Sequence, residues 1–284
     1  MTAPLGSVVI PAHNEQAVIL PGLDALFEGF AEGELDVVIV CNGCTDGTAE
    51  LARSSGHPVT VVELQTASKP AALREGDSRT TVFPRIYLDA DVRMSGSSAR
   101  AVLERLRGAG TQAARPPLVY DSAGASAVVR SYYRARSRLP TVMTALWGAG
   151  VYGLSVAGRG RFAEFPDLQA DDFFVDQQFR VDDVEIVPCA PVVVRTPQRA
   201  RHLRAVLRRT YRGKSYARER TGAARPDTMS SSLGDLVRTA GSSPRAAADA
   251  IVYAVFSVWG RLGRRPAGNH QWERDDSSRR PPER

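Results

Sequence analysis

Short apolar runs that alternate with helix-like segments dominate the first 120 residues of this chain. The runs have the length and the valine and isoleucine content of buried strands, and they cover residues 7–10, 36–40, 59–64 and 85–88. Segments with helical spacing lie between and after them, at residues 21–30, 48–55, 70–79 and 97–108. Strands that alternate with helices form a mostly parallel sheet with helices on both faces. We therefore expect an α/β fold.

Length and composition restrict the remaining possibilities. With 284 residues the chain can bury one α/β domain, alone or with an appendage, and its 43% hydrophobic and 24% charged content is typical of globular proteins. No apolar run approaches the roughly 20 residues that cross a bilayer, and residues 1–30 lack the Lys or Arg that begins a signal peptide. Three cysteines, with one C-x-x-C at Cys41 and Cys44, argue against a disulfide framework or a zinc site. We expect a cytoplasmic protein.

The second half of the chain has a less regular pattern. After Pro116-Pro117, a helix is expected over residues 126–138, and a glycine-rich segment follows at residues 148–160. Short strands are expected near residues 184–187 and 191–194. The tail after Pro266 is polar, and we expect it to be partly disordered.

Polar motifs follow three of the four strands expected in the first half. Pro11-Ala12-His13-Asn14-Glu15 follows the first strand, Cys41 to Thr48 follows the second, and Asp89-Ala90-Asp91 follows the fourth. In sheets of this kind, ligands bind outside the carboxyl ends of the strands. The first two motifs are also compatible with ordinary turns in which Asn14, Asp46 or Thr48 caps the next helix. Their shared position at strand ends favours a ligand site.

Asp89 and Asp91 carry the most informative chemistry. Residues i and i+2 of an extended segment point the same way, so both carboxylates face one ligand. Two unpaired carboxylates at the end of a buried strand are costly unless a positive charge meets them. Mg²⁺ or Mn²⁺, bridging diphosphate oxygens, would supply that charge. The alternative is a surface pair of acids that Arg85 or Arg93 neutralises.

Together these motifs resemble the inverting, nucleotide-sugar-dependent glycosyltransferases of family 2, which have the GT-A fold. The resemblance rests on S-V-V-I-P-A-H-N-E at residues 7–15, V-I-V-C-N-G-C-T-D-G-T-A-E at 38–50, S-K-P-A-A-L-R-E-G at 68–76 and Y-L-D-A-D-V at 87–92, and it extends over about residues 6–215. Many members carry Asp where this chain has Cys41 or Asn42. The resemblance therefore leaves open whether the donor is a UDP-sugar or a GDP-sugar.

The resemblance implies a fold and a role for each motif. The fold would be GT-A, a Rossmann-like, mostly parallel sheet flanked by helices, with a basic helical appendage at the C-terminus. Residues 1–115 would bind the nucleotide sugar and residues 116–195 the acceptor, followed by the basic helical region at 196–265 and the tail at 266–284. Asp91 would be the better ligand of Mg²⁺ or Mn²⁺. The donor site would consist of Pro11, Ala12, Asn14 and Glu15 around the nucleobase and ribose, Asn42 at the base, Lys69 near the donor, and Asp89 with Asp91 as the D-x-D motif.

Asp171 and Asp172 form a second acidic pair, next to Phe173 and Phe174. Acids beside aromatic rings in a partly desolvated site can have a raised pKa, which suits proton transfer. The position resembles the family's acidic pair, often Glu-Asp, whose second member is the catalytic base. By this likeness Asp172 is the base and Asp171 replaces the Glu. The alternative is a helix N-terminus that carries acids.

Basic residues are concentrated at residues 195–225, which hold eleven Arg or Lys against one acid, Glu219. Thr196 as cap and Pro197 at the first helical position suit the start of a helix there. One face of this helix carries Arg201, Arg204, Arg208 and Arg212. That face is either solvated or a clamp for an anion, such as the donor diphosphate or an anionic lipid. The low aromatic content of 7% and the lack of a nucleic-acid-binding motif argue against nucleic acid.

Residues 249–262 have the spacing of an amphipathic helix. Ile251, Val255, Trp259 and Leu262 lie on one side with Val252 and Phe256, and Asp249, Tyr253 and Ser257 lie on the other. Two interpretations fit this pattern. The apolar side either packs against the rest of the protein or lies in a membrane interface.

The sequence thus predicts a hexosyl- or other glycosyltransferase that moves a sugar from a UDP- or GDP-linked donor to an acceptor hydroxyl with inversion. The acceptor is expected to be lipid- or glycan-linked, with peripheral contact at the inner face of the cell membrane. A retaining enzyme of the same fold and a non-catalytic protein that binds nucleotide sugars or anionic lipids are the alternatives. A nucleotidyltransferase is disfavoured because Pro11 to Glu15 is not a glycine-rich basic loop.

Overall fold

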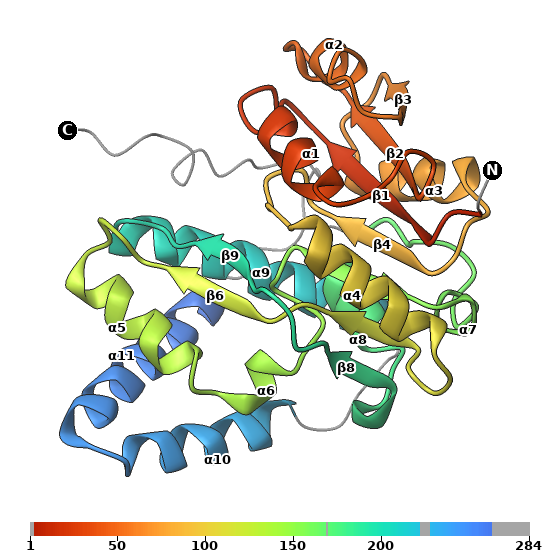
Figure 1. Cartoon of the computed structure of the whole chain (residues 1–284). Helices are drawn as coiled ribbons and strands as arrows, with labels where there is room; N and C mark the ends of the chain where they lie inside the picture. The colour runs from red at the N-terminus through yellow and green to blue at the C-terminus, as the bar shows by residue number, and fades with distance from the viewer. Residues whose placement is uncertain (1–2, 169, 222–227, 263–284) are drawn as a thin grey trace. The chain divides into compact units, whose positions relative to one another are not determined.

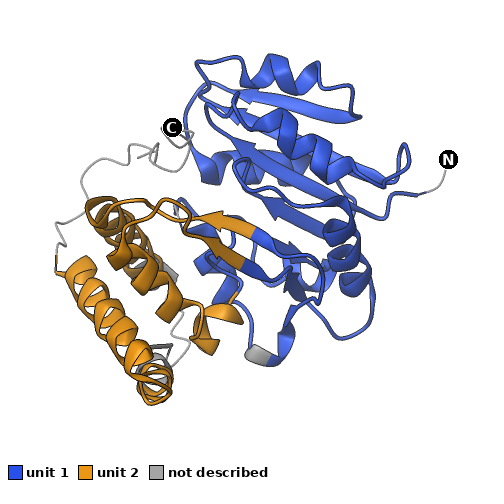
Figure 2. Ribbon diagram, turned by 60° about the vertical axis from the view of Figure 1, so that its left-hand side comes forward, with its two compact units in different colours: residues 1–118, 146–192 blue, residues 119–145, 193–284 orange. Residues whose placement is uncertain are grey.

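The structure is a computed structural model that describes residues 3–168, 170–221 and 228–262. The chain forms two compact units, which we describe separately (Figure 2). The first unit comprises residues 1–118 and 146–192, and the second comprises residues 119–145 and 193–284. The polar tail predicted for residues 266–284 lies outside the described residues. Within the described ranges, no helix has both the length and the hydropathy needed to cross a bilayer.

The first unit is built on a seven-stranded sheet with the order β3-β2-β1-β4-β7-β5-β8 (Figure 1). Its strands are β1 (Gly6–Ala12), β2 (Leu35–Asn42), β3 (Val59–Leu64), β4 (Arg85–Leu88), β5 (Ala113–Arg115), β7 (Val151–Leu154) and β8 (Val184–Ile186). β1 to β4 run parallel, whereas β7 is antiparallel to both β4 and β5. The predicted α/β fold with a mostly parallel sheet is confirmed.

Helices cover both faces of this sheet: α1 (Ile19–Phe27), α2 (Thr48–Arg53), α3 (Lys69–Arg79), α4 (Gly96–Arg107), α7 (Val156–Arg159) and α8 (Asp171–Asp176), with a 3-10 turn at Val181–Asp183. α3 packs so closely on β1 that a Cβ at Gly76 would lie 2.3 Å from Val9 Cγ1. α4 also approaches β1, where a Cβ at Gly6 would lie 2.5 Å from Leu103 Cδ2. Strand residues an odd number apart point to opposite faces, so α3 and α4 lie on opposite sides of the sheet.

β1 and β2 form the buried centre of the first unit. Every residue of β1 is buried, and so is every residue of β2 except Asp36. A strand with helices on both faces needs apolar side chains on both faces, which is why its sequence is a continuous apolar run without alternation. This requirement is why both strands could be predicted from the sequence.

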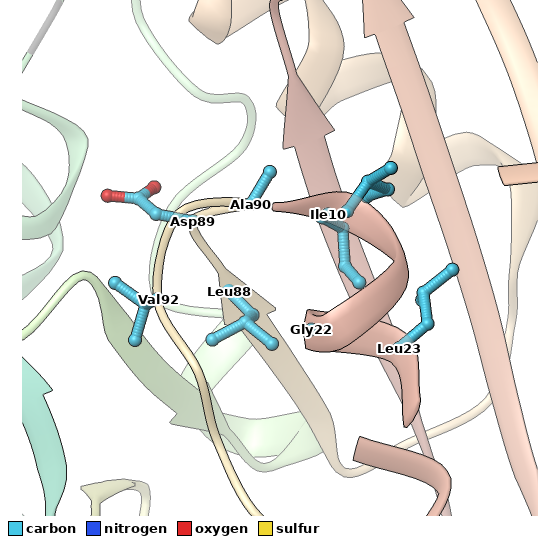
Figure 3. Close-up of a pocket in the computed structure, with 8 residues that line it drawn as sticks. Ile10, Gly22, Leu23, Leu88, Asp89, Ala90 and Val92 are labelled. Carbon is cyan, nitrogen blue, oxygen red and sulfur yellow. The ribbon is translucent and has the colours of Figure 1, made fainter. Parts of the chain in front are cut away.

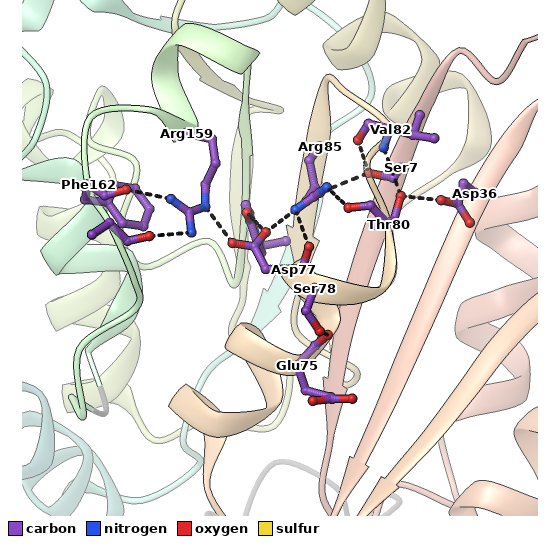
Figure 4. A network of polar contacts seen from close by, with 12 residues as sticks. Ser7, Asp36, Glu75, Asp77, Ser78, Thr80, Val82, Arg85, Arg159 and Phe162 are labelled. Carbon is purple, nitrogen blue, oxygen red and sulfur yellow. Dashed lines mark hydrogen bonds and ion pairs between the residues drawn. The ribbon is translucent and has the colours of Figure 1, made fainter.

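A buried ion network joins β4 to α3 and α7 (Figure 4). The guanidinium group of Arg85, which is 2% exposed, pairs with the carboxylate of Asp77. Arg159 Nε donates to the second carboxylate oxygen of Asp77 at 2.6 Å, and the Tyr87 hydroxyl donates to the first at 2.6 Å. Since Arg85 is engaged with Asp77, no ion pair joins it to Asp89, contrary to one of the two pairings considered from the sequence.

The second unit combines helices with a two-stranded sheet. The helices are α5 (Ala127–Arg136), α6 (Pro140–Met143), α9 (Ala200–Thr221), α10 (Thr228–Ala240) and α11 (Pro244–Arg261), and the sheet pairs β6 (Leu118–Asp121) with β9 (Val192–Arg195). Its core is formed by apolar side chains of α5, α9 and α11, among them Val129, Tyr132, Leu203, Leu207 and Phe256. The helical C-terminal region expected from the sequence is confirmed.

α9 begins at Ala200, which is later than the start predicted from Thr196 and Pro197. The Thr196 amide donates to the Asp121 carbonyl at 2.9 Å, which continues the pairing of β6 with β9. The Gln198 carbonyl accepts from the Ser126 amide at 2.8 Å. These long-range backbone bonds hold residues 196–198 outside the helix, so tertiary pairing overrides the local cap signal.

Candidate functional site

The strand order reverses at β1, and this reversal gathers the sequence motifs at one edge of the sheet. The chain places β2 and then β3 on one side of β1, and later places β4 on the other side. Because all four strands are parallel, their carboxyl ends lie at the same edge. In open α/β sheets, this point of reversal is where ligands bind.

Hydrogen bonds join the motif after β1 to the motif after β2. Asn14 has a positive φ of 55°, and its Oδ1 accepts from the Thr45 amide at 2.7 Å. The amide of the buried Glu15 donates to Thr48 Oγ1 at 2.7 Å. Thr48 opens α2, and its amide donates to Asp46 Oδ1 at 3.1 Å. The N-cap of α2 is Gly47 and that of α1 is Val18, so the caps considered from the sequence at Asp46, Thr48 and Asn14 were wrong. The hydrogen bonds join the two motifs into one connected loop structure.

The side chain of Asn42 is fully buried and links three elements. Its Nδ2 donates to the Ala12 carbonyl at the end of β1, at 2.8 Å, and its Oδ1 accepts from the Ser68 amide at 3.0 Å. Ser68 caps α3 by accepting from the Ala71 amide at 3.3 Å. Asn42, predicted to reach the base, thus uses its amide group to hold the start of α3, where Lys69 follows directly.

Lys69 lies between two carboxylates. Its Nζ is 2.7 Å from Asp89 Oδ1 and 2.7 Å from Asp171 Oδ1. Burial lowers the pKa of Lys69, but the charges of Asp171 and Asp89 outweigh it, and the net shift of this pKa is upward. The ammonium form of Lys69 is therefore favoured, and it is shared by two acids that come from distant parts of the sequence.

The carboxylates at this edge outnumber the cation that holds them. Burial raises the pKa of Asp89 to about 7, Lys69 opposes the rise, and the charges of Asp171 and Asp91 add to it. An additional cation would relieve this repulsion. The oxygen donors suit Mg²⁺ or Mn²⁺, which takes one or two carboxylates and completes its shell with phosphate and water oxygens. Among the described residues, no group of three His, Cys, Asp or Glu side chains could hold a metal ion by itself.

Asp171 and Asp172 open α8 but lie in different environments. Asp171 is 4% exposed, and its Oδ2 accepts from the Tyr152 hydroxyl at 3.0 Å. Asp172 is half-buried, and its Oδ2 accepts from the Gly148 amide at 2.7 Å. Its Oδ1 accepts from the amide of Phe173 at 2.7 Å. Asp171 is thus fixed in the interior, while Asp172 is oriented by backbone donors and keeps access to solvent.

The segment before β7 belongs to the glycine-rich stretch noted in the sequence, and it contacts Asp89. Gly150 has a φ of +66°, and a Cβ there would lie 2.5 Å from Val92 Cγ2 and 3.2 Å from Asp89 Oδ2. Its carbonyl accepts from the Asp89 amide at 2.8 Å. Tyr152 stacks on Tyr87 with ring centroids 5.1 Å apart. The run of three glycines around Val151 and Tyr152 was the available signal, but it does not show which strand end this segment meets.

A small hollow lies beside Asp89 (Figure 3). Apart from Asp89 its lining is apolar, and it consists of Ile10, Ile19, Gly22, Leu23, Leu88, Ala90 and Val92. The Asp89 carboxylate points away from this lining in Figure 3. The hollow therefore belongs to the packing between the strand ends and α1, and the polar chemistry of Asp89 is directed elsewhere.

The arginine face predicted for residues 201–212 lies on α9 in the second unit. Leu203 and Leu207 of this helix are buried in the core of that unit. The guanidinium group of Arg204 lies 4.2 Å from the ring centroid of Trp259. Its predicted action as a clamp for a diphosphate or a lipid stays a prediction.

A family model matches the part of the chain that carries most of these motifs. Residues 7–146 match the family model described as Glycosyl transferase family 2. The match includes Asn42, Lys69, Asp89 and Asp91, whereas the acidic pair at the start of α8 lies beyond it. No curated protein matches the chain in sequence.

Solved structures share the fold. The mannosyltransferase PcManGT from Pyrobaculum calidifontis, in complex with GDP-Man and Mn²⁺, is 20% identical over 91% of this chain and 88% of its own, with a TM-score of 0.59. Glucosyl-3-phosphoglycerate synthase from Mycobacterium tuberculosis, in complex with Mn²⁺, UDP-glucose and phosphoglyceric acid, is 20% identical over 78% of this chain and 80% of its own, with a TM-score of 0.55. The same enzyme with Mg²⁺ and UDP gives the same values. The expected GT-A fold is confirmed.

Proposed function

We propose that this protein, whose residues 7–146 match the glycosyl transferase family 2 model, moves a sugar from a nucleoside-diphosphate sugar to an acceptor hydroxyl with inversion. The observation that carries this proposal is the acidic cluster at the carboxyl edge of the sheet. There Asp89 and Asp171 share the single ammonium group of Lys69, at 2.7 Å each. Two carboxylates thus have one ammonium group between them, and a metal ion bound to a diphosphate would add positive charge there.

The donor would lie across the ends of β1, β2 and β4. Asp91, with Asp89 beside it, would hold Mg²⁺ or Mn²⁺, which neutralises the diphosphate leaving group when it is bound. The loop at residues 11–15 would contact the nucleoside, and Asn42 would keep that loop and Lys69 in position. The two similar structures named above contain Mn²⁺ together with GDP-Man or UDP-glucose, which supports this arrangement.

Asp172 would be the general base. Its two amide donors, Gly148 and Phe173, fix its orientation while it keeps access to solvent. In the proposed step Asp172 takes the proton of the acceptor hydroxyl, the acceptor oxygen bonds to the anomeric carbon, and the bond to the diphosphate oxygen breaks with its electron pair on the diphosphate. A single displacement of this kind inverts the configuration. Asp171 is buried against Lys69 and Tyr152, so it would position the site without acting as the base.

The acceptor is proposed at the level of its chemistry. It would carry a free hydroxyl group that reaches Asp172, and a lipid-linked sugar or a glycan fits this requirement. Product analysis by NMR tests the stereochemistry directly: a β-glycoside from an α-linked donor supports the single displacement, and an α-glycoside would exclude it.

Calorimetry of nucleotide binding tests the donor site. UDP or GDP is titrated into the protein with and without Mn²⁺, and we expect affinity to fall about tenfold or more without the metal. Asp91→Asn should remove most of this metal dependence. The matched control is Glu104→Gln on the outside of α4, which should behave like the unmodified protein. Metal-dependent binding that survives Asp91→Asn would remove Asp91 from the site.

A further inference from the structure

The helix α11 buries two of its polar residues beside Phe256, while several of its large apolar residues are exposed. Asp249 and Ser257 are 1% and 6% exposed, respectively. The opposite face carries large apolar side chains at helical spacing, with exposures of 65% for Ile251, 55% for Val255, 51% for Val258, 41% for Trp259 and 77% for Leu262. A helix that faced only water on this side would carry the reverse pattern.

An ion pair fixes this orientation. Asp249 accepts from Arg134 Nε at 2.9 Å and from Arg134 Nη2 at 2.6 Å, and the Ser131 hydroxyl donates to it at 2.5 Å. Arg134 and Ser131 both lie on α5. Breaking a buried, doubly bonded carboxylate pair is costly, so α11 cannot simply rotate to hide its apolar face. The exposed face is thus a fixed part of the second unit.

The surroundings of this face are strongly basic. Residues 119–145, 193–217 and 234–262 of the second unit hold fifteen Arg or Lys and three acids. Two of these acids, Asp235 and Asp249, are buried. In the first unit, residues 3–118 and 146–192 (apart from residue 169) hold thirteen Arg or Lys and twenty-two acids. The positive charge of the chain is therefore concentrated in the unit that exposes the apolar helix.

The aromatic and basic groups of this face meet in one place. The Arg204 guanidinium lies 4.2 Å from the centroid of the Trp259 ring, and the Arg261 guanidinium lies 4.9 Å from that of Tyr211. Trp is the residue that favours the boundary between lipid headgroups and acyl chains, and Arg pairs with the phosphates above it. α11 ends in this combination, since Trp259, Arg261 and Leu262 are its last turn and cap.

We propose that the exposed face of α11, formed by Ile251, Val255, Val258, Trp259 and Leu262, binds the surface of an anionic lipid bilayer. The helix would lie in the interface plane, with its apolar side chains among the acyl chains and the arginines of the unit at the headgroups. This surface belongs to the second unit, whereas the residues of the proposed donor site belong to the first, and the proposal does not depend on the transfer reaction. A second copy of the chain is less favourable than a bilayer as the partner of this face, because two such basic units repel each other. Nucleic acid would leave the apolar side chains without a partner.

Vesicle flotation of the full-length protein tests the proposal. The probes are vesicles of phosphatidylcholine alone and of phosphatidylcholine with phosphatidylglycerol. We expect flotation with the anionic vesicles, a clear preference over neutral ones, and weaker binding at high salt. The double variant Ile251→Gln/Val255→Gln should lower binding to anionic vesicles by about tenfold or more. Both positions are exposed, so folding should be retained, which circular dichroism and nucleotide affinity check.

Val156→Gln is the matched control, because Val156 is a 68% exposed valine of the first unit. It should float like the unmodified protein. Binding that ignores lipid charge, or that survives Ile251→Gln/Val255→Gln, would overturn the proposal. The proposal would also be overturned if the unmodified protein did not bind vesicles and light scattering showed it to be a dimer, while Ile251→Gln/Val255→Gln was a monomer. The exposed face would then be covered by a second copy of the chain.

Discussion

The two units each bury an aspartate in an ion pair, but with opposite charge balance. At the edge of the large sheet, Asp171 and Asp89 share the one ammonium group of Lys69. In the second unit, the carboxylate of Asp249 pairs with two guanidinium groups, that of Arg134 at 2.6 Å and that of Arg138 at 3.8 Å. It also accepts a hydrogen bond from the Ser131 hydroxyl. The first cluster has one cation for two carboxylates, and the second has two cations for one carboxylate. An uncompensated buried charge is costly, so the first cluster suits the proposed ligand site. The second cluster, which we call the structural joint, holds α11 against α5.

The network around Asp77 supports this distinction within the first unit. Asp77 is balanced by Arg85 and Arg159, as Asp249 is by its arginines. The tyrosine stack links this network to the site, because Tyr87 donates to Asp77 and Tyr152 donates to Asp171. Acids near one another in the first unit thus differ in the number of cations that pair with them, and this difference separates the proposed binding site from the network that supports it.

The largest expected effect concerns Asp172. Asp172→Asn should lower kcat by about 10²–10⁴-fold with nearly unchanged donor affinity, because a base acts only on the acceptor proton in the transition state. Single-turnover rates and calorimetry measure the two quantities. Asp171→Asn is the control, and its deficit should lie in stability and donor affinity because it pairs with Lys69. Near-normal transfer by Asp172→Asn would refute the assignment of the base.

The structural joint should respond only in stability. Asp249→Asn should lower the free energy of unfolding by about 2–3 kcal/mol, because Arg134 and Arg138 lose their shared carboxylate. Denaturant titration followed by circular dichroism measures it. Asp167→Asn breaks the pair with Arg74 at a side chain that is 77% exposed, and it should cost less than about 1 kcal/mol. Equal costs would mean that burial of Asp249 does not matter.

The site cluster should be the one that a metal stabilises. Lys69→Met leaves Asp89 and Asp171 without their ammonium group, and without metal it should cost about 1–2 kcal/mol of stability. Added Mn²⁺ should raise the Tm of this variant more than that of the unmodified protein, because the ion replaces the missing charge. Lys214→Met, at the only other lysine, is the control. An equal Mn²⁺ effect in all three proteins would contradict the idea of a cation-poor site.

The smallest effect is the pH dependence of the structural joint. Hydrogen bonds from Arg134, together with Ser131 and against a smaller opposing effect of burial, lower the pKa of Asp249 below its ordinary value of 3.8. The folded protein thus binds the proton less readily than the unfolded chain, and the stabilisation is present above the ordinary value and lost as pH falls through the folded one. The difference in unfolding free energy between the unmodified protein and Asp249→Asn should therefore shrink below about pH 4. A difference that stays constant down to pH 2 would show that the pair contributes no charge effect.

Much of the first unit could be predicted from the sequence. The four strands at residues 7–10, 36–40, 59–64 and 85–88 lie within or coincide with β1 to β4, because strands buried on both faces need continuous apolar runs. The positions of Asp89 and Asp91 after β4 follow from the same pattern. These features depend on side chains within a few residues of each other, so they can be predicted from the sequence alone.

The pairing of distant residues was decided by the tertiary structure. Sequence spacing does not show that Lys69 meets Asp171 and Asp89, or that the Gly148 amide holds Asp172. Nor does periodicity show which side of an amphipathic helix is buried. On the side predicted to be apolar, Phe256 is buried in the core, whereas Ile251 and Val255 are exposed. The ion pair of Asp249 with Arg134 on α5 holds the helix in this orientation. The energy of such a pair depends on which helices meet, and that is fixed only when the chain has folded.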